Sequence, residues 1–150
     1  MAKKRKLKIY RKIAVPRGYL SLKGQCWKIQ SEIIRRQAKG ICFTCGKQQD
    51  WKETDVGHYK HGCMDFIRKN LHCQCKGCNK WKHGNLEVYA LKLDDKYGHG
   101  ILQKLDKQKW TTFEPNYEEL IKLKKKLTKE LQKVINSEES DFYPITKQIT

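Results

Sequence analysis

The sequence predicts an α+β protein in which a small core of two strands and a short helix is flanked by helices. Two observations predict the core: the chain carries two Cys-x-x-Cys pairs, and the segment between them is long enough to run out, turn and return as a hairpin. A third predicts the flanking helices, because apolar residues recur at steps of three and four on both sides of that segment. With 150 residues and 38% hydrophobic content, the chain has room for one modest domain.

A basic arm is predicted over residues 1–18. Its first cations are Lys3, Lys4, Arg5 and Lys6. The whole chain agrees in sign, because 33 basic residues against 16 acidic ones give a formal net charge of +17. A charge of this size repels itself unless a polyanion is bound, so nucleic acid is the expected partner and the arm is expected to contact phosphates. On charge alone, ribosomal-type RNA binding stays open.

The pattern of apolar residues argues against a membrane or secreted protein. The basic start is not followed by the apolar stretch of a signal peptide, and no apolar run is long enough to span or anchor in a bilayer. We therefore expect a reducing compartment, in which cysteines serve as metal ligands or free thiols rather than as disulfides.

Residues 20–38 are predicted to form a helix. Leu22, Cys26, Ile29 and Ile33 fall on one face of it, and Gly40 is well placed to end it. Because Cys26 lies on this apolar stripe, it is expected to be a buried thiol.

The paired cysteines predict a structural zinc site. The predicted ligands are Cys42, Cys45, Cys75 and Cys78. Tetrahedral zinc binds four thiolates readily, whereas a redox role for one pair would leave the other pair unexplained. Cys73 offers another ligand beside the second pair, but the Cys-x-x-Cys spacing favours Cys75, and Cys63 is expected to be a free thiol.

Zinc would hold the two cysteine pairs together, so that the chain between them forms a hairpin. Residues 55–59 lie on its outgoing arm, Asn70 and Leu71 lie on the return, and a short helix starts at Cys78 and Asn79. In this ββα arrangement we expect zinc to bring Asn79 opposite His58. A site with four thiolates has no open position, so the zinc is expected to be scaffold and not catalyst.

The order Cys-x-x-Cys, His, Asn-Leu, Cys-x-x-Cys-Asn resembles the HNH (ββα-metal, treble-clef) nuclease superfamily. Four segments are similar to the phage NinG/Rap family of DNA-junction recombination nucleases, namely residues 54–59, 68–72, 74–79 and 82–86. The resemblance runs from about Ile41 to about Ile135. The Cys-x-x-Cys-Asn segment also resembles the phage endonuclease VII type of junction resolvase.

The resemblance and the chemistry of phosphodiester hydrolysis together assign catalytic roles. His58 is the expected general base, since a neutral imidazole can accept the proton of the attacking water. Asn79 is the expected ligand of one catalytic Mg²⁺ or Mn²⁺, and Asp55 is expected to share that ion. The resemblance implies that Asn70 holds the hairpin loop and so orients the histidine.

The residue before the histidine departs from the superfamily pattern. Many members place the metal-binding aspartate there, whereas this chain has Gly57. His61 and Asp65 are therefore alternatives to Asp55 as the second metal ligand.

Basic residues around the predicted site are expected to contact DNA phosphates. They are Lys60, Arg68, Lys69, Lys80, Lys82 and His83. Trp51 and Trp81 are expected to pack around the zinc rather than to stack on bases.

Amphipathic helices are predicted on the C-terminal side. Asn85 is placed as the N-cap of a helix that Gly98 ends, and a short helical piece follows over residues 101–105. These complete a nuclease domain over residues 19–110. A further amphipathic helix over residues 111–136 either docks on its own core or forms a dimeric coiled coil, and residues 137–150 are expected to be a flexible tail.

The resemblance implies a metal-dependent, structure-selective endonuclease that cleaves branched recombination intermediates such as Holliday junctions and leaves 5′-phosphate and 3′-hydroxyl ends. The expected partner is branched DNA and the expected assembly is a homodimer, because two symmetric nicks need two active sites. The expected location is the cytoplasm of a bacterial host, if the chain is phage-encoded. The alternatives are a non-catalytic zinc-ribbon protein that binds nucleic acid and an HNH nicking or homing-type endonuclease on duplex DNA.

Overall fold

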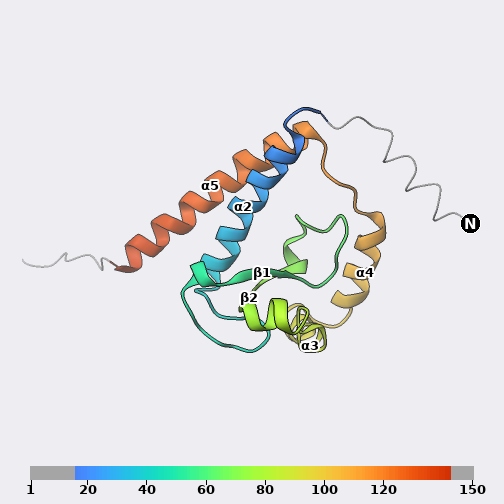
Figure 1. Ribbon diagram of the computed structural model, residues 1–150, viewed down its shortest axis with the longest axis vertical. Helices are drawn as coiled ribbons and strands as arrows, with labels where there is room; N and C mark the ends of the chain where they lie inside the picture. Colours follow the sequence, from blue (N-terminus) through green and yellow to red (C-terminus); the bar gives the residue numbers. More distant parts are fainter. Residues whose placement is uncertain (1–15, 143–150) are drawn as a thin grey trace, which may run out of the picture.

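The computed structural model describes residues 16–142 (Figure 1). In chain order its elements are α2 (Tyr19–Gln37), the single turn η1 (Trp51–Glu53), β1 (Asp55–His58), the single turn η2 (Arg68–Asn70), β2 (Leu71–Gln74), the short helix η3 (Gly77–Trp81), α3 (Leu86–Tyr97), α4 (Ile101–Thr111) and α5 (Tyr117–Phe142). This mixture of helices with one small sheet confirms the coarse fold prediction. The first part of the basic arm, with Lys3 to Lys6, lies outside the described residues.

The sheet is the predicted hairpin. β1 and β2 are antiparallel, with Asp55 opposite Gln74 and His58 opposite Leu71. One face packs on α2, where Val56 and Leu71 join Ile34 in an apolar cluster. The side chains of the other face point toward η3 and α3.

Two helices from opposite ends of the described chain, α2 and α5, lie side by side (Figure 1). Cys26 and Ile33 of α2 bury against Leu120 and Leu127 of α5. The two helices run in the same direction, because Tyr19 contacts Pro115 at one end and Arg36 pairs with Glu138 near the other. Of the two arrangements that the sequence left open for the C-terminal helix, the structure therefore shows docking on its own domain.

α4 and α5 are both longer than predicted. α4 continues from residue 105 to Thr111, and α5 continues from residue 136 to Phe142, so the predicted flexible tail begins too early. The extension of α5 is tied to α2 by an ion pair of 2.6 Å between Arg36 and Glu138. The rest of the predicted tail lies outside the described residues.

A second core lies beneath α3 and α4. Tyr89 and Leu93 of α3 pack with Ile101 and Leu105 of α4, and the buried Met64 joins them from the loop after β1. This core holds that loop, which follows His58, against the helices. Within the described residues, none of the helices is long and apolar enough to cross a membrane.

Candidate active site beside a four-cysteine centre

The two cysteine pairs meet in space, as predicted. The sulfurs of Cys42, Cys45, Cys75 and Cys78 all lie within 4.8 Å of one another. Within residues 16–142 this is the one group of three or more Cys, His, Asp or Glu side chains close enough to hold one metal ion. The soft thiolate donors and their number fit zinc, so this cluster could bind such a metal as a closed structural site.

Tight backbone turns aim these sulfurs at one point. In the first turn the Gly46 N–H donates to the Cys42 carbonyl at 2.9 Å, and the Cys42 N–H donates to the Lys47 carbonyl at 2.8 Å. In the second turn the Cys78 N–H donates to the sulfur of Cys75 at 3.4 Å. The local backbone bonds thus shape each cysteine pair.

The pKa values of Cys42 and Cys45 are shifted in opposite directions. Burial raises the pKa of Cys42, but hydrogen bonds from the Cys45 backbone and the Thr44 hydroxyl outweigh it and lower that pKa to about 6. The Lys47 backbone lowers the pKa of Cys45, but burial and the three neighbouring thiols raise it to about 12. A cation bound among the four sulfurs would favour the thiolate form of each.

The remaining cysteines lie outside this cluster. Cys73 is buried in the apolar cluster between the sheet and α2, which settles the choice between Cys73 and Cys75 as ligand. Cys26 is fully buried, as predicted, and its thiol points at the Leu120 carbonyl at 3.5 Å. Cys63 is half-buried and has no cysteine partner among the described residues.

The turn from η3 to α3 is strained and tightly held. Three consecutive residues have positive φ, at 49° for His83, 89° for Gly84 and 50° for Asn85. Gln74 Nε2 donates to the Gly84 carbonyl at 2.8 Å. Asn85 occupies the predicted N-cap position, but its side chain makes no cap hydrogen bond and instead directs Nδ2 at the sulfur of Cys78, at 3.8 Å.

Asn79 and Asp55 form an oxygen-bearing pair next to the cysteine cluster. Asn79 follows the last cysteine on η3, and its Nδ2 donates to Asp55 Oδ2 at 3.2 Å. Lys80 Nζ lies 3.8 Å from the same carboxylate oxygen. Turning the Asn79 amide over would place its oxygen beside the carboxylate, and these two oxygens with several waters suit Mg²⁺ or Mn²⁺.

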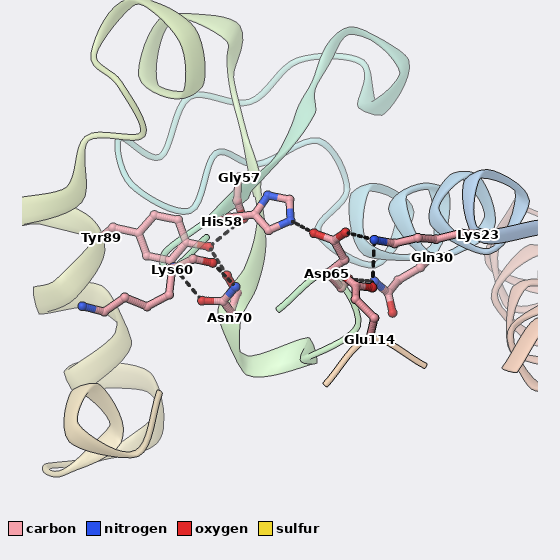
Figure 2. Close-up of polar contacts among 9 residues, drawn as sticks. All are labelled: Lys23, Gln30, Gly57, His58, Lys60, Asp65, Asn70, Tyr89 and Glu114. Atoms are coloured by element: carbon pink, nitrogen blue, oxygen red, sulfur yellow. Dashed lines mark hydrogen bonds and ion pairs between the residues drawn. The ribbon is translucent and has the colours of Figure 1, made fainter. Parts of the chain in front are cut away.

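His58 is held by a chain of charged side chains (Figure 2). Its Nε2 lies 3.1 Å from Asp65 Oδ1, and Asp65 Oδ2 lies 3.1 Å from Lys23 Nζ on α2. Lys23 also pairs with Glu114 at 2.9 Å. The bond to His58 and the Lys23 ammonium lower the pKa of Asp65 despite its burial, so the carboxylate accepts the Nε2 proton and leaves Nδ1 free to act as a base.

Ring contacts complete the surroundings of His58. Its imidazole stacks on Trp27 of α2 at 5.0 Å between ring centres, and on His61 at 5.6 Å. The sequence named Asp65 and His61 only as alternative metal ligands, and it missed Trp27 and Lys23 altogether. No local pattern could have found them, because α2 and the loop after β1 meet only in the fold.

Asn70 holds the loop that follows His58 (Figure 2). Its side chain is fully buried, its Oδ1 accepts from the Lys60 N–H at 2.8 Å, and its Nδ2 donates to the Lys60 carbonyl at 2.9 Å. These two hydrogen bonds to the Lys60 backbone fix the loop after β1, as expected for a residue that holds the loop. The effect of Asn70 on catalysis stays a prediction.

A buried network on the other face of the sheet holds the backbone beside His58. Tyr97 donates to His72 Nε2 at 3.0 Å, His72 Nδ1 donates to the Tyr89 hydroxyl at 3.0 Å, and Tyr89 donates to the Gly57 carbonyl at 3.0 Å. Burial first, and then the charges of Lys96 and Arg68, lower the pKa of His72 to about 3. His72 is therefore a neutral structural residue, a role that the sequence did not predict.

The predicted catalytic residues fall into two groups. Asp55 contacts Asn79 on η3, whereas His58 stacks on α2, because side chains three residues apart on a strand point to opposite faces. Within residues 16–142 no hydrogen bond or ion pair joins Asn79 to His58, and the expected placement of Asn79 opposite His58 stays a prediction. His61 contacts His58 rather than the Asp55–Asn79 pair.

The predicted phosphate-binding side chains differ in their exposure and in whether they already have partners within the protein. Arg68 bonds to Gln37 and Glu130, Lys60 pairs with Asp106 at 3.2 Å, and Lys69 lies over the Tyr97 ring. Lys80 pairs weakly with Asp55, while Lys82 and His83 are exposed. Trp51 lies beneath Arg36 of α2, and Trp81 is 80% exposed, so the prediction that Trp81 packs around the zinc is wrong.

Comparison with known proteins places the chain in a phage family. Residues 1–138 match the family model described as "Bacteriophage Lambda NinG protein". The chain belongs to the NinG family. Among curated NinG proteins it is 29% identical to that of Escherichia phage 933W over 143 residues, which cover 89% of this chain and 67% of that protein. It is 30% identical to that of Salmonella phage P22 over 118 residues and 29% identical to that of Escherichia phage lambda over 115 residues.

The NinG relatives are longer than the matched region. The alignments cover 73% of this chain and 57% of the P22 protein, and 71% of this chain and 55% of the lambda protein. No solved structure matches the chain.

Proposed function

We propose that this chain is a metal-dependent, structure-selective DNA endonuclease of the HNH (ββα-metal, treble-clef) type that cleaves branched recombination intermediates such as Holliday junctions. The observation that carries the proposal is the 3.2 Å contact between Asn79 Nδ2 and Asp55 Oδ2. Asn79 directly follows Cys78, the last cysteine of the cluster. Membership of a phage NinG family and the charge of +17 agree with DNA as the substrate.

The Asp55 carboxylate and the Asn79 amide oxygen would hold the catalytic Mg²⁺ or Mn²⁺. When bound, such an ion supplies positive charge to the phosphate oxygens and to the leaving group. Lys80 now lies beside Asp55 and would be released toward the DNA backbone. The cysteine cluster fixes the start of η3 and so fixes Asn79, without taking part in the reaction.

His58 would act as general base through Nδ1, because Nε2 is engaged by Asp65. In-line attack places the water on the side of phosphorus opposite the leaving oxygen. Base and metal ligands should therefore flank the scissile phosphate rather than touch each other. The separation of His58 from the Asp55–Asn79 pair across β1 is compatible with this requirement.

The proposed partners follow from the same reaction. Two symmetric nicks require two active sites, so we infer a homodimer that uses a surface other than the apolar face of α5, which α2 covers. Because the relatives are phage proteins, the proposed place of action is the cytoplasm of the infected bacterium.

The proposal is tested with a labelled four-way junction and a matched linear duplex, incubated with Mg²⁺ or Mn²⁺. The wild type should cut the junction, and His58→Ala should cut at least about 10²-fold more slowly, the usual contribution of a general base. Asn79→Ala should require higher metal concentrations. His99→Ala, a substitution at an exposed histidine paired with Asp94, should cut like the wild type.

A non-catalytic zinc module that binds nucleic acid is the second candidate. It is favoured by the finding that, in the described part of the chain, the four cysteines are the one cluster of three or more Cys, His, Asp or Glu ligands. A protein of this kind would bind both the junction and the duplex and would cut neither.

Two further outcomes would contradict the endonuclease proposal. Equal cutting by wild type and His58→Ala would reject the proposed mechanism, and equal cutting of duplex and junction would reject the structure selectivity.

A further inference from the structure

The segment that follows Asn79 presents an aromatic side chain to solvent. Lys80, Trp81, Lys82 and His83 are all exposed, and Trp81 is 80% exposed. The other tryptophans near the sheet have partners, since Trp27 stacks on His58 and Trp51 lies beneath Arg36. Within residues 16–142 the Trp81 ring makes no stacking, cation–π or hydrogen-bond contact. The Trp81 indole is therefore open to stack on an aromatic ring of a ligand.

The backbone that carries Trp81 is rigid. The Lys82 N–H donates to the Gly77 carbonyl at 3.0 Å, which closes η3 around Trp81. The Gly84 N–H lies within hydrogen-bond distance of both the Cys78 and Asn79 carbonyls, at 2.9 and 3.0 Å. Together with the strained residues 83–85, these bonds tie the segment to the cysteine cluster. A ring on such a support loses little conformational freedom when a ligand stacks on it.

The charges around Trp81 select the ligand. Lys80 and Lys82 flank it directly in sequence and Lys76 lies five residues earlier, and all three are exposed. Lys76 pairs with Glu53 at 3.7 Å and Lys80 with Asp55 at 3.8 Å, long exposed contacts that a phosphate could replace. A second copy of this chain would bring like charges together, which opposes self-association through this surface. A polyanion with aromatic rings satisfies both features, because its phosphates meet the lysines while a base meets the indole.

We propose that Trp81 is a stacking site for an unstacked base at the branch point of DNA, next to the Asp55–Asn79 pair. The inference deepens the proposed function, because it assumes that this surface faces branched DNA. Inside a fully paired duplex every base face is covered by its stacked neighbours, whereas an opened branch point exposes base faces within the DNA. Stacking on Trp81 would thus favour branched over linear DNA without reading sequence.

Binding measurements without added Mg²⁺ or Mn²⁺ test the inference independently of cleavage. A four-way junction carrying 2-aminopurine at the branch point is compared with linear duplex, using the wild type, Trp81→Phe, Trp81→Leu and Trp81→Ala. In Trp81→Leu and Trp81→Ala, which lack the ring, junction binding should weaken about tenfold, while duplex binding changes less than about twofold. The fluorescence quenching of 2-aminopurine that the wild-type indole causes on binding should disappear in both variants. Trp81→Phe keeps an aromatic face and should stay within about threefold of the wild type for the junction.

Trp110→Ala is the matched control, because Trp110 is 62% exposed on α4 and carries no part of the inference. Zinc content and circular dichroism of each variant should match the wild type. Unchanged junction affinity in Trp81→Ala would overturn the inference, as would equal losses for junction and duplex. If the wild type does not cut DNA but junction binding still depends on Trp81, the endonuclease proposal fails and the stacking site stands.

Discussion

Gly57 stands before His58 because the space for a side chain at this position is occupied by Gln74. A Cβ added to Gly57 would overlap Oε1 of Gln74. Gln74 is fully buried and cannot swing away, since its Nε2 bonds to both Thr44 and Gly84. The superfamily that the sequence resembles often carries aspartate here. In this chain the departure has a steric cause, and Asp55 is the carboxylate that reaches Asn79.

Gly57→Ala should therefore destabilise the fold by about 1–3 kcal/mol through overpacking of the sheet face against Gln74. Chemical denaturation measures the change. Gly24→Ala is the control, because Gly24 lies in α2 with nothing within 4 Å of an added Cβ, and alanine should stabilise that helix slightly. If both variants lose the same stability, the steric account of Gly57 is wrong.

Asp65 is predicted to position His58 for its proposed role as base. Asp65→Asn keeps the shape but can present an N–H to Nε2, which would move the imidazole proton to Nδ1 and block the base. We expect kcat to fall by about 10²-fold with KM little changed, and the ¹⁵N spectrum of the imidazole to show the changed tautomer.

Asp65→Glu should recover part of the lost kcat, because it restores a carboxylate. Asp106→Asn removes an exposed partner of Lys60 and should change neither kcat nor the spectrum. An Asp65→Asn variant with normal kcat and the wild-type tautomer would show that Asp65 serves only the Lys23 ion pair.

At the scale of elements, α3 is joined to the hairpin by a buried histidine. His72 of β2 lies between Tyr89 and Tyr97 of α3, and its folded pKa of about 3 is far below the ordinary value of 6.5. The folded chain therefore binds fewer protons at this site than the unfolded chain. The stability that neutral His72 contributes is complete above about pH 6.5 and is lost as the pH falls toward 3.

Unfolding in urea at pH 7, 6 and 5 should show this loss as a slope that approaches about 1.4 kcal/mol per pH unit. His72→Gln can still donate and accept hydrogen bonds but does not titrate, so its stability should fall less steeply with acid. Any acid release of metal from the cysteines is common to both proteins and cancels in the comparison. Parallel slopes would rule out His72 as the origin.

At the scale of the whole molecule, the cysteine cluster joins parts of the chain that are otherwise held together by a few hydrogen bonds, such as those of Gln74 with Thr44 and Gly84. It ties the turn after α2 to η3, and the bonds of Gly84 and Asn85 extend this tie to the start of α3. The two-stranded sheet alone is too small to hold these elements, since isolated hairpins are marginal in water.

Removal of the metal by a chelator should consequently lower the melting temperature by ~10 °C or more. Cys75→Ser should do the same without chelator and should reduce the metal content. Cys63→Ser replaces a cysteine outside the cluster and should retain both metal and stability. A chelated protein that melts like the untreated one would show that the cysteines do not need a metal.

Features with a local cause could be predicted from the sequence. The Cys-x-x-Cys spacing predicted the four-thiol cluster, helical periodicity predicted α2 and α5, and the distance between the cysteine pairs predicted the hairpin. These features could be predicted because spacing along the chain sets which side chains share a turn or a face. The extension of α5 beyond residue 136 could not, since it is supported by a contact with α2, the ion pair between Arg36 and Glu138.

The arrangement of the candidate site, by contrast, follows from the packing of the whole fold. It paired His58 with Asp65, Asn79 with Asp55 and His72 with two tyrosines, and it left Trp81 80% exposed, two residues after Asn79. The physical reason is that each of these outcomes depends on which face of β1 or β2 meets which helix. That choice is made by the packing of α2, η3 and α3 around the sheet, and no spacing within one segment encodes it.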